Sequence, residues 1–174
     1  SFQKFGGKVV NKKIQIPSDW KDRTILHIGA ADFQTQVWIN GKTAGTHKGG
    51  YTPIELDITG HLQQGENTIV VCCRDDLRTG LQPGGKQSNR FESYGCSYTR
   101  TTGIWQTVWL ESVPERSLSQ YRMRPDIQNG QVLFDVSTRG NVLGLSIEVE
   151  AFTNGKSAGI LSMDATNRSS GAMK

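Results

Sequence analysis

The sequence predicts an all-β fold, whose first part is a β-sandwich of the jelly-roll kind. Apolar and polar residues alternate in many short segments, glycine is frequent at 20 of 174 residues, and no segment has the spacing of an amphipathic helix. With 35% hydrophobic and 21% charged residues, the composition is typical of a turn-rich globular protein. The net charge of +4 is scattered, so no nucleic-acid partner is indicated, and no run approaches the roughly 20 apolar residues that cross a membrane.

The predicted strands of the first part follow one another, each ended by a turn signal. The strand Lys8 to Ile16 is expected to end at Pro17, and a strand over 34–40 ends in Asn40-Gly41, a dipeptide typical of a type I′ hairpin. A short helical turn is expected over 59–62. Further strands are predicted over residues 24–30, 51–58 and 67–74.

The strand over 67–74 is apolar on both faces, which predicts a central position in the sandwich. Cys72 and Cys73 are adjacent in this strand and point to opposite faces, so they cannot bridge each other. We interpret both as small apolar core residues. A metal site on this pair would need further Cys or His ligands, and the three histidines lack a suitable spacing.

Residues 75–103 form a long insertion rich in Gly, Ser, Gln and Asn, and an insertion of this length is usually functional or disordered. It leads into a predicted strand over 104–111, which places Trp105 and Trp109 on one side and Ile104, Val108 and Leu110 on the other. Hydroxyls and an arginine beside aromatic rings are typical of a sugar-contacting edge. The alternative is a core strand that follows a surface loop.

The composition changes near residue 114, and the alternation then becomes more regular. Apolar residues are in phase over 132–136 and over 145–151, and Asn154-Gly155 predicts a second hairpin. About four strands are expected in this part, fewer than the seven of an immunoglobulin-like sandwich. We therefore expect the second part to be incomplete, with uncovered strand edges.

An ordered set of motifs over residues 20–114 resembles family 2 glycoside hydrolases, the β-galactosidase and β-glucuronidase group. Each motif alone is weak, and their common order makes the set specific. The motifs are Val37-Trp38-Ile39-Asn40-Gly41-Lys42, Gly45 to Pro53, Leu56-Asp57-Ile58-Thr59 with Gly65-Glu66-Asn67, Pro83-Gly84-Gly85-Lys86-Gln87, and Tyr98 to Gln106.

The resemblance implies a jelly-roll sugar-binding domain over residues 1–114 and an incomplete immunoglobulin-like β-sandwich over 115–174. In the family a (β/α)8 barrel follows and carries the two catalytic glutamates of the retaining mechanism. The chain would support and partly wall that absent barrel, which acts on terminal β-linked sugars of the galactoside or glucuronide type. No catalytic residue, cofactor or metal is therefore expected within the chain.

The expected partners are a carbohydrate substrate and the barrel, with no nucleic acid or membrane, and association with further copies of the chain is left open. The resemblance suggests a bacterial protein of the periplasm or the cytoplasm. The alternative functions are a free-standing carbohydrate-binding module, a lectin-like sandwich, or a structural sandwich that mediates oligomerisation.

Four residues of the insertion are candidate sugar contacts: Ser97, Tyr98, Arg100 and Asp75. In some relatives an aspartate six residues before the glycine of the Gly-Ile segment touches the sugar, and Ser97 occupies that position here. For Arg100 the alternative is a salt bridge within the loop. For Asp75 and its neighbour Asp76 the alternatives are a structural cation, a solvated loop, or an ion pair with Arg74 or Arg78.

Two other motifs have structural interpretations. His47 is expected to form a structural hydrogen bond, and Gly84-Gly85-Lys86-Gln87 is expected to dock on the barrel, because it lacks the spacing of a phosphate-binding loop.

Overall fold

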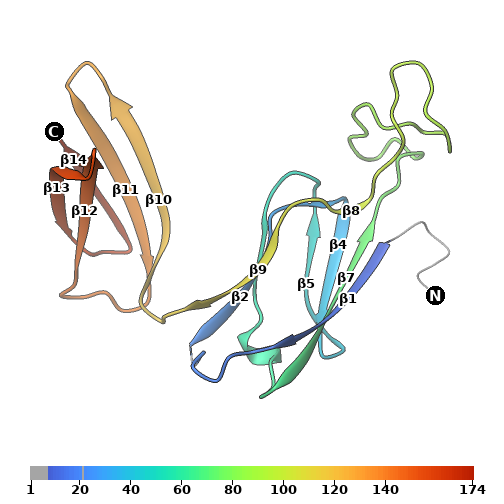
Figure 1. Cartoon of the computed structure of the whole chain (residues 1–174), viewed down its shortest axis with the longest axis horizontal. Helices are drawn as coiled ribbons and strands as arrows, with labels where there is room; N and C mark the ends of the chain where they lie inside the picture. Colours follow the sequence, from blue (N-terminus) through green and yellow to red (C-terminus); the bar gives the residue numbers. More distant parts are fainter. Residues whose placement is uncertain (1–7, 21) are drawn as a thin grey trace. The chain divides into compact units, whose positions relative to one another are not determined.

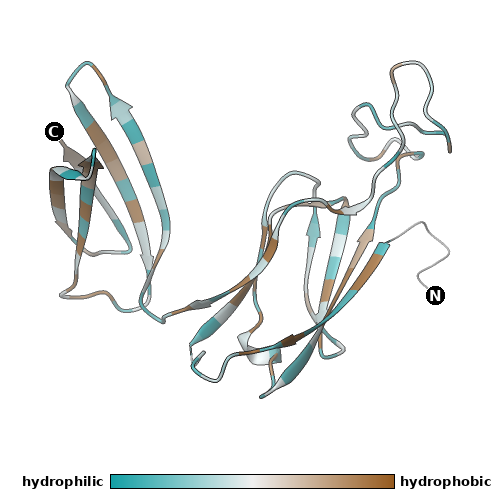
Figure 2. Ribbon diagram, viewed as in Figure 1, coloured by the Kyte–Doolittle hydropathy of each residue, from teal (hydrophilic) through white to brown (hydrophobic). Residues whose placement is uncertain are grey.

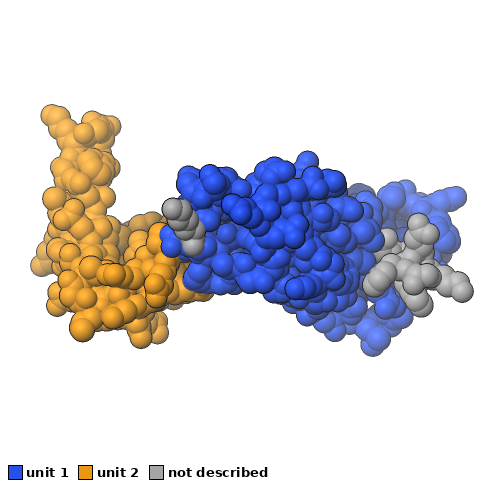
Figure 3. Space-filling view, turned by 90° about the horizontal axis from the view of Figure 1, so that it is seen from below, with its two compact units in different colours: residues 1–113 blue, residues 114–174 orange. Residues whose placement is uncertain are grey.

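The computed structural model describes residues 8–20 and 22–174, which form β-strands and a short 3₁₀ helix (Figure 1). Within the described residues, no helix has the length and apolar character needed to cross a membrane. The chain divides into two compact units, Ser1–Val113 and Pro114–Lys174, which are coloured separately in Figure 3.

The described part of the first unit contains three antiparallel sheets, with strand orders β1-β7-β4-β5, β6-β2-β9 and β3-β8. The 3₁₀ helix η2 (Thr59–His61) follows β6 and confirms the predicted helical turn. The strands are β1 (Lys8–Gln15), β2 (Arg23–Ile28), β3 (Ala31–Asp32), β4 (Gln34–Ile39), β5 (Lys42–Lys48), β6 (Ile54–Asp57), β7 (Glu66–Arg74), β8 (Gly103–Ile104) and β9 (Val108–Val113).

The core of this unit is formed by alternate side chains of the two larger sheets, visible as brown bands on the strands in Figure 2. Strand β7 pairs with β1 on one side and β4 on the other, so the predicted central position of this strand is confirmed. Cys72 and Cys73 are buried and form no disulfide, as predicted. Cys73 is a member of the core between the sheets, whose other buried members are Leu26, Ile28, Ala31, Val37, Ile39, Ile54, Ile58, Ile69 and Val71.

Two predicted strands differ from the structure. The strand expected over 51–58 is confined to Ile54–Asp57. The continuous strand expected over 104–111 is wrong, because β8 and β9 are separated by residues 105–107. These three residues lie opposite Gly29 and Ala30 alone, so the strand carries one extra residue there. A Cβ on Gly29 would lie 2.8 Å from the Cβ of Gln106, so glycine is required for this close approach.

A buried asparagine holds together the end of the first unit at which the β4–β5 turn and the start of β7 lie. Asn67, at the start of β7, is 1% exposed and uses its whole amide. Its Oδ1 accepts hydrogen bonds from the Gln63 backbone N–H and the Asn40 side chain, both at 2.8 Å. Its Nδ2 donates to the carbonyls of Gln63 at 2.9 Å and Gly65 at 3.0 Å. The Asn40 Oδ1 in turn accepts the Thr68 N–H at 2.9 Å, so the β4–β5 turn is fastened to β7.

Both predicted hairpin turns are present. Asn40 and Gly41 have φ angles of 52° and 80°, and Asn154 and Gly155 have 49° and 74°. A type I′ turn requires positive φ at both central residues, which asparagine tolerates and glycine adopts freely. The predicted turn chemistry is confirmed at both places.

The second unit has five strands, one more than expected, in two antiparallel sheets with orders β10-β11-β14 and β12-β13. The predicted alternation of apolar and polar side chains is confirmed, since Phe134, Val136 and Ile147 are buried while Glu148 and Glu150 are exposed. The last strand, RSSGAM, has little apolar alternation, which weakens its sequence signal. The strands are β10 (Ser117–Asp126), β11 (Gln131–Arg139), β12 (Ser146–Thr153), β13 (Lys156–Asp164) and β14 (Arg168–Met173).

The two sheets of the second unit pack through small residues. A Cβ on Gly171 of β14 would lie 2.9 Å from Leu161, and one on Gly159 of β13 would lie 3.2 Å from Met173. Tyr121 and Met123 of β10 pair directly with the buried Val136 and Phe134 and therefore share their face, yet both are largely exposed. The sandwich thus leaves the β10 part of its inner face uncovered.

Replacing Asn67 with alanine is expected to lower the free energy of unfolding by about 3 kcal/mol, because its buried amide loses four partly buried hydrogen bonds. Urea unfolding followed by tryptophan fluorescence measures the change. Asn11→Ala, at an exposed position of β1, is the control and is expected to change stability by less than about 0.5 kcal/mol. Equal stability of the two variants would contradict the role of Asn67.

Replacing Gly41 with alanine is expected to cost about 1 kcal/mol, although nothing lies within 4 Å of the added Cβ, because the φ of 80° is unfavourable for alanine. Gly60→Ala is the matched control, since its site is equally open and its φ lies outside the positive range that disfavours L-residues. Thermal unfolding should show a lower Tm only for Gly41→Ala; a similar drop in both variants would argue against backbone strain.

Candidate functional site

The long insertion between β7 and β8 is the candidate site, and it is ordered by its own hydrogen bonds. Ser88 lies at its centre and is 0% exposed. The Ser88 hydroxyl donates to the Glu92 carbonyl at 2.6 Å and accepts the Arg90 N–H at 3.0 Å. The Ser88 N–H donates to the Tyr98 carbonyl at 2.7 Å, and the Tyr98 N–H donates to the Lys86 carbonyl at 2.7 Å. Two distant parts of the insertion are therefore held side by side.

A polar cluster joins the base of the insertion to the sheets. The Asp75 carboxylate accepts hydrogen bonds from the Gln82 amide and, at 3.2 Å, from the Thr102 hydroxyl. The Gln87 Nε2 donates to Asp32 of β3 at 3.2 Å, and its Oε1 accepts the Thr101 N–H at 2.8 Å. These contacts tie the first, middle and last residues of the insertion together, and we call Asp32, Asp75, Gln82, Gln87 and Thr102 the base cluster.

The electrostatics of the base cluster centre on Asp32. Burial and then the neighbouring Asp75 carboxylate raise the pKa of Asp32 above its usual value, and the hydrogen bond from Gln87 opposes them. Gly50 leaves room for this carboxylate, because a Cβ there would lie 2.8 Å from the Asp32 Oδ1. Two close carboxylates attract hydrogen-bond donors, which the amides and hydroxyl of the cluster supply.

The four predicted sugar-contacting residues occupy different surroundings. Asp75 belongs to the base cluster and forms no hydrogen bond or ion pair with the other three in the described chain. Ser97 exchanges two backbone hydrogen bonds with Tyr94, at 2.8 and 3.2 Å. Tyr98 is fixed through its backbone while the residue as a whole is 65% exposed. Ser97, Tyr98 and Arg100 thus lie on one ordered segment, and Asp75 lies at the base.

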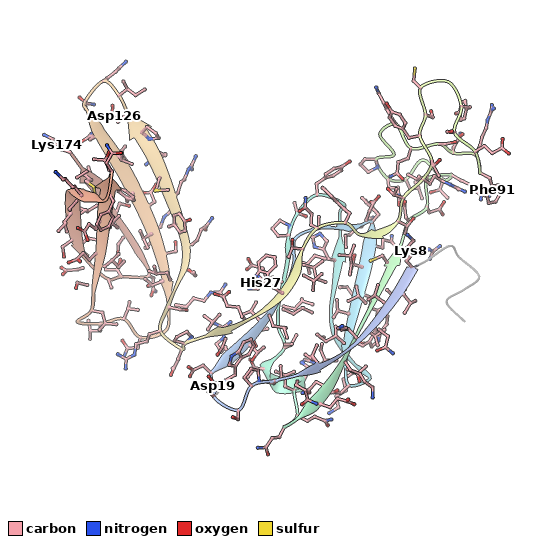
Figure 4. All side chains as sticks on the ribbon, viewed as in Figure 1. Lys8, Asp19, His27, Phe91, Asp126 and Lys174 are labelled. Carbon is pink, nitrogen blue, oxygen red and sulfur yellow. The ribbon has the colours of Figure 1, made fainter. Side chains whose placement is uncertain are left out.

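Arg100 is held by an aromatic ring. Its guanidinium lies 5.1 Å from the centre of the Phe91 ring, and the guanidinium of Arg78 lies at the same distance from that ring. Figure 4 labels Phe91 at the outer end of the insertion, away from the sheets. Within the described residues Arg100 has no ion pair, so the predicted loop salt bridge is replaced by a cation–π contact.

His47, Asp76 and the Gly84–Gln87 segment each form hydrogen bonds that define their structural roles. The predicted structural role of His47 is confirmed, since its Nε2 lies 3.1 Å from the Thr52 hydroxyl. Asp76 accepts the backbone N–H of Arg78 at 3.2 Å. Gly84 and Gln87 form a turn, with the Gln87 N–H donating to the Gly84 carbonyl at 3.0 Å. No group of three His, Cys, Asp or Glu side chains converges in the part of the chain that the structure describes, so it offers no ready cation site there.

The two tryptophans after the insertion have separate partners. The Trp105 indole N–H donates to the Gly50 carbonyl at 2.8 Å, and its ring meets Tyr51 edge to face at 5.8 Å. Trp109 stacks on His27 at 4.6 Å with the planes 4° apart, and the His27 Nε2 lies 2.9 Å from the Glu111 carboxylate. Trp105, just after the insertion, and Tyr51 are both exposed and form one aromatic surface through this contact.

The contacts of the site also involve Asp32, Gln82, Gln87 and Ser88, which were not identified as site residues from the sequence. Gln87 ends one of the quoted motifs, which was a usable signal for its position. Asp32 lies in a two-residue strand 55 positions before its partner Gln87, and no local pattern marks it.

Comparison with known proteins places the first unit in a described family. The family "Glycosyl hydrolases family 2, sugar binding domain" matches residues 3–114. A β-galactosidase of Priestia megaterium is 28% identical over 127 residues, which cover 72% of this chain and 11% of that protein. A β-glucuronidase of Paenibacillus borealis is 29% identical over 145 residues, covering 76% of this chain and 23% of that protein.

Solved structures have the same fold. The apo structure of Bacteroides uniformis β-glucuronidase 3 has a TM-score of 0.75 and 22% identity, over 97% of this chain and 22% of that one. The crystal structure of Ruminococcus gnavus β-glucuronidase has a TM-score of 0.74 and 20% identity, over 97% of this chain and 29% of that one. The chain thus spans less than a third of each of these relatives.

Replacing Asp32 with asparagine is expected to stabilise the fold at pH 7. A carboxyl whose folded pKa lies above its unfolded value destabilises the native state when it is ionised. The free energy of unfolding therefore starts to fall as the pH rises above 3.8, the ordinary pKa of the group, and the loss is complete above the folded pKa. Asparagine keeps an oxygen for Gln87 and carries no charge. Urea unfolding should therefore show a gain at pH 7 that disappears at pH 3.

Asp19→Asn, at an exposed turn, is the control for this prediction and should show no such pH-dependent gain. A loss of stability in Asp32→Asn at pH 7 would contradict the assigned electrostatics.

Proposed function

Since this chain belongs to the family of glycosyl hydrolase family 2 sugar-binding domains, we propose that it is the non-catalytic N-terminal portion of a retaining glycoside hydrolase. The enzyme would act on terminal β-linked sugars of the β-galactoside or β-glucuronide type. The chain would support its catalytic barrel and form part of the wall of its substrate pocket.

The match of the family over residues 3–114 is the observation that carries the proposal. The printed names of the relatives support the substrate class, because they are β-galactosidases and β-glucuronidases. This chain spans only 11% and 23% of those proteins. The small share favours an accessory role for the chain, since hydrolysis would reside in the remainder. Retention needs two carboxylates about 5 Å apart on either side of the scissile bond, and we assign no such pair to this chain.

The finer architecture belongs to the same proposal. We assign residues 1–114 to a jelly-roll sugar-binding domain, supported by the two larger sheets that share one core. We assign residues 115–174 to an immunoglobulin-like β-sandwich, supported by the close packing of β13 on β14. The exposed Tyr121 and Met123 on the inner face of β10 support further strands covering this sandwich in the whole enzyme.

The insertion is proposed to supply the wall of the pocket. Tyr98 presents an exposed ring that can stack on a pyranose, and Arg100 presents a guanidinium that can donate to sugar hydroxyls or a carboxylate. The Ser88 contacts fix the backbone of this segment, which lowers the entropy lost on binding. Ser97 would contribute a hydroxyl, and Asp75 would act from the base cluster.

The second candidate is a free-standing carbohydrate-binding module. It is favoured by the exposed rings around the insertion, namely Tyr51, Phe91, Tyr98 and Trp105. Such rings are the usual stacking surface for sugars in proteins that bind them without chemistry.

The 174-residue chain is expected to hydrolyse neither a chromogenic β-galactoside nor a chromogenic β-glucuronide. Its affinity for galactose and glucuronate should be weaker than about 1 mM in calorimetric titration, because an intact pocket needs the groups of the barrel. Turnover by pure chain would overturn the proposal, and micromolar binding would favour the carbohydrate-binding module.

Arg100→Gln is expected to reduce the glucuronate-induced chemical-shift changes of residues 97–100 in an NMR titration, because it removes the charge that meets the carboxylate. Arg90→Gln is a matched control, since the Arg90 guanidinium also lies over a ring of the insertion, at 4.0 Å from Tyr94. Equal effects of the two substitutions would remove Arg100 from the proposed wall.

A further inference from the structure

A groove of about 250 Å³ lies in the second unit, over the sheet of β10, β11 and β14. Its lining combines two arginines and one aspartate with uncharged polar side chains. The lining residues are Gln120, Tyr121 and Arg122 of β10, Asp135 and Ser137 of β11, and Arg168 of β14. None of the four residues proposed to contact the substrate lines this groove.

The register of the sheet places the charged and hydroxyl side chains of the lining on one face. Ser137 lies directly opposite Gln120 on one side and Arg168 on the other. Asp135 lies directly opposite Arg122. Directly opposite residues of antiparallel strands point to the same face. The alternate residues of β11 are buried in the core, so the polar side chains occupy the outer face of the sheet.

The two arginines of the lining are available to a ligand. Neither the Arg122 nor the Arg168 guanidinium forms an ion pair or a hydrogen bond with residues 8–20 and 22–174. The two residues are two strands and two positions apart, so their backbones are separated by about 12 Å, a gap that two long side chains can close on a shared anion. Such an anion also relieves the repulsion between the two positive charges.

The carboxylate of the lining is neutralised by a third arginine. Asp135 accepts a hydrogen bond from the Ser170 hydroxyl at 2.9 Å and forms an ion pair with Arg124 at 3.1 Å. The Ser170 hydrogen bond, and then the charges of Arg124 and Arg168, lower the pKa of Asp135, so this carboxylate is ionised at neutral pH. Three arginines thus surround one aspartate, and an excess of positive charge remains at the groove.

The uncharged lining adds two hydrogen-bond donors. The Ser137 hydroxyl belongs to a half-buried residue and has no hydrogen bond within the described part of the chain. Gln120 supplies a side-chain amide. A phosphate or sulfate ester offers three acceptor oxygens and a carboxylate offers two. Donors that come from three neighbouring strands therefore match the tetrahedral group better, and guanidiniums bind such groups through paired N–H donors.

We propose that this groove binds a tetrahedral oxyanion, a phosphate or sulfate group, between Arg122 and Arg168, with the Ser137 hydroxyl donating to it. The same donors serve a free ion and an ester carried by a sugar. The second unit thereby has a binding site of its own, independent of the pocket wall proposed for the first unit.

The test is an NMR titration of the 174-residue chain with inorganic sulfate and galactose 6-sulfate, beside galacturonate and galactose, at constant ionic strength. Both sulfates should shift the amide signals of residues 120–122, 135–137 and 168. Galacturonate should bind at least about fivefold more weakly, because its carboxylate satisfies fewer donors. Equal affinities for the two sulfates would identify the free ion as sufficient, and tighter binding of galactose 6-sulfate would identify a sugar ester as the ligand.

Substitutions in the groove should change sulfate affinity in opposite directions. Arg122→Gln and Arg168→Gln should each weaken binding by about fivefold to tenfold, because each removes a charge-assisted contact. Asp135→Asn should strengthen binding by about threefold, because it removes the negative charge of the lining and keeps an oxygen for Ser170.

Lys156→Gln is the control, because Lys156 is an exposed lysine of β13, in the other sheet of the unit, and does not line the groove. It should leave the affinity within about twofold, since solvent screens a distant exposed charge. The Tm of the arginine variants should equal that of the parent chain, which separates lost binding from lost folding. Galacturonate binding as tight as sulfate, no effect of either arginine substitution, or weaker binding by Asp135→Asn would each overturn the proposal.

Discussion

The hydrogen-bonded pair of Asn40 and Asn67 is the constraint on which the first unit depends. It fastens the β4–β5 turn to the start of β7, and all four hydrogen bonds of the Asn67 amide are made within the protein. A shift of one residue between β4 and β7 would exchange the faces of every side chain on a strand. The pair therefore fixes which residues of β4 and β7 enter the core and which lie on the outer face of the sheet.

Much of the fold could be predicted because its signals are local. Asn-Gly turns, the apolar strand over 67–74 and the alternation over 132–136 each express the conformation of a few consecutive residues. The break between β8 and β9 could not be predicted in this way. It depends on the approach of Gln106 to Gly29, a residue 77 positions earlier, and the sequence around Gln106 continues the strand pattern.

The site was predictable in outline and not in its contacts. The length of residues 75–103 predicted an insertion that is either functional or disordered, and the family-like motifs included Gln87. The base cluster depends on Asp32, whose partners lie far along the chain, and Arg100 pairs with the Phe91 ring where a carboxylate had been considered. Such pairings are chosen by tertiary packing among several candidates of similar chemistry, so a single sequence does not distinguish them.

The hydrogen bond between Asp75 and Thr102, at 3.2 Å, joins the two ends of the insertion before either enters a sheet. The entropy of closing a loop grows only slowly with its length, so a segment anchored in this way can gain or lose residues at small cost. The insertion is thus a segment that can be exchanged without changing the sheets. The insertion can therefore differ in length and sequence while the pairing of β7 and β8 with their neighbouring strands stays the same.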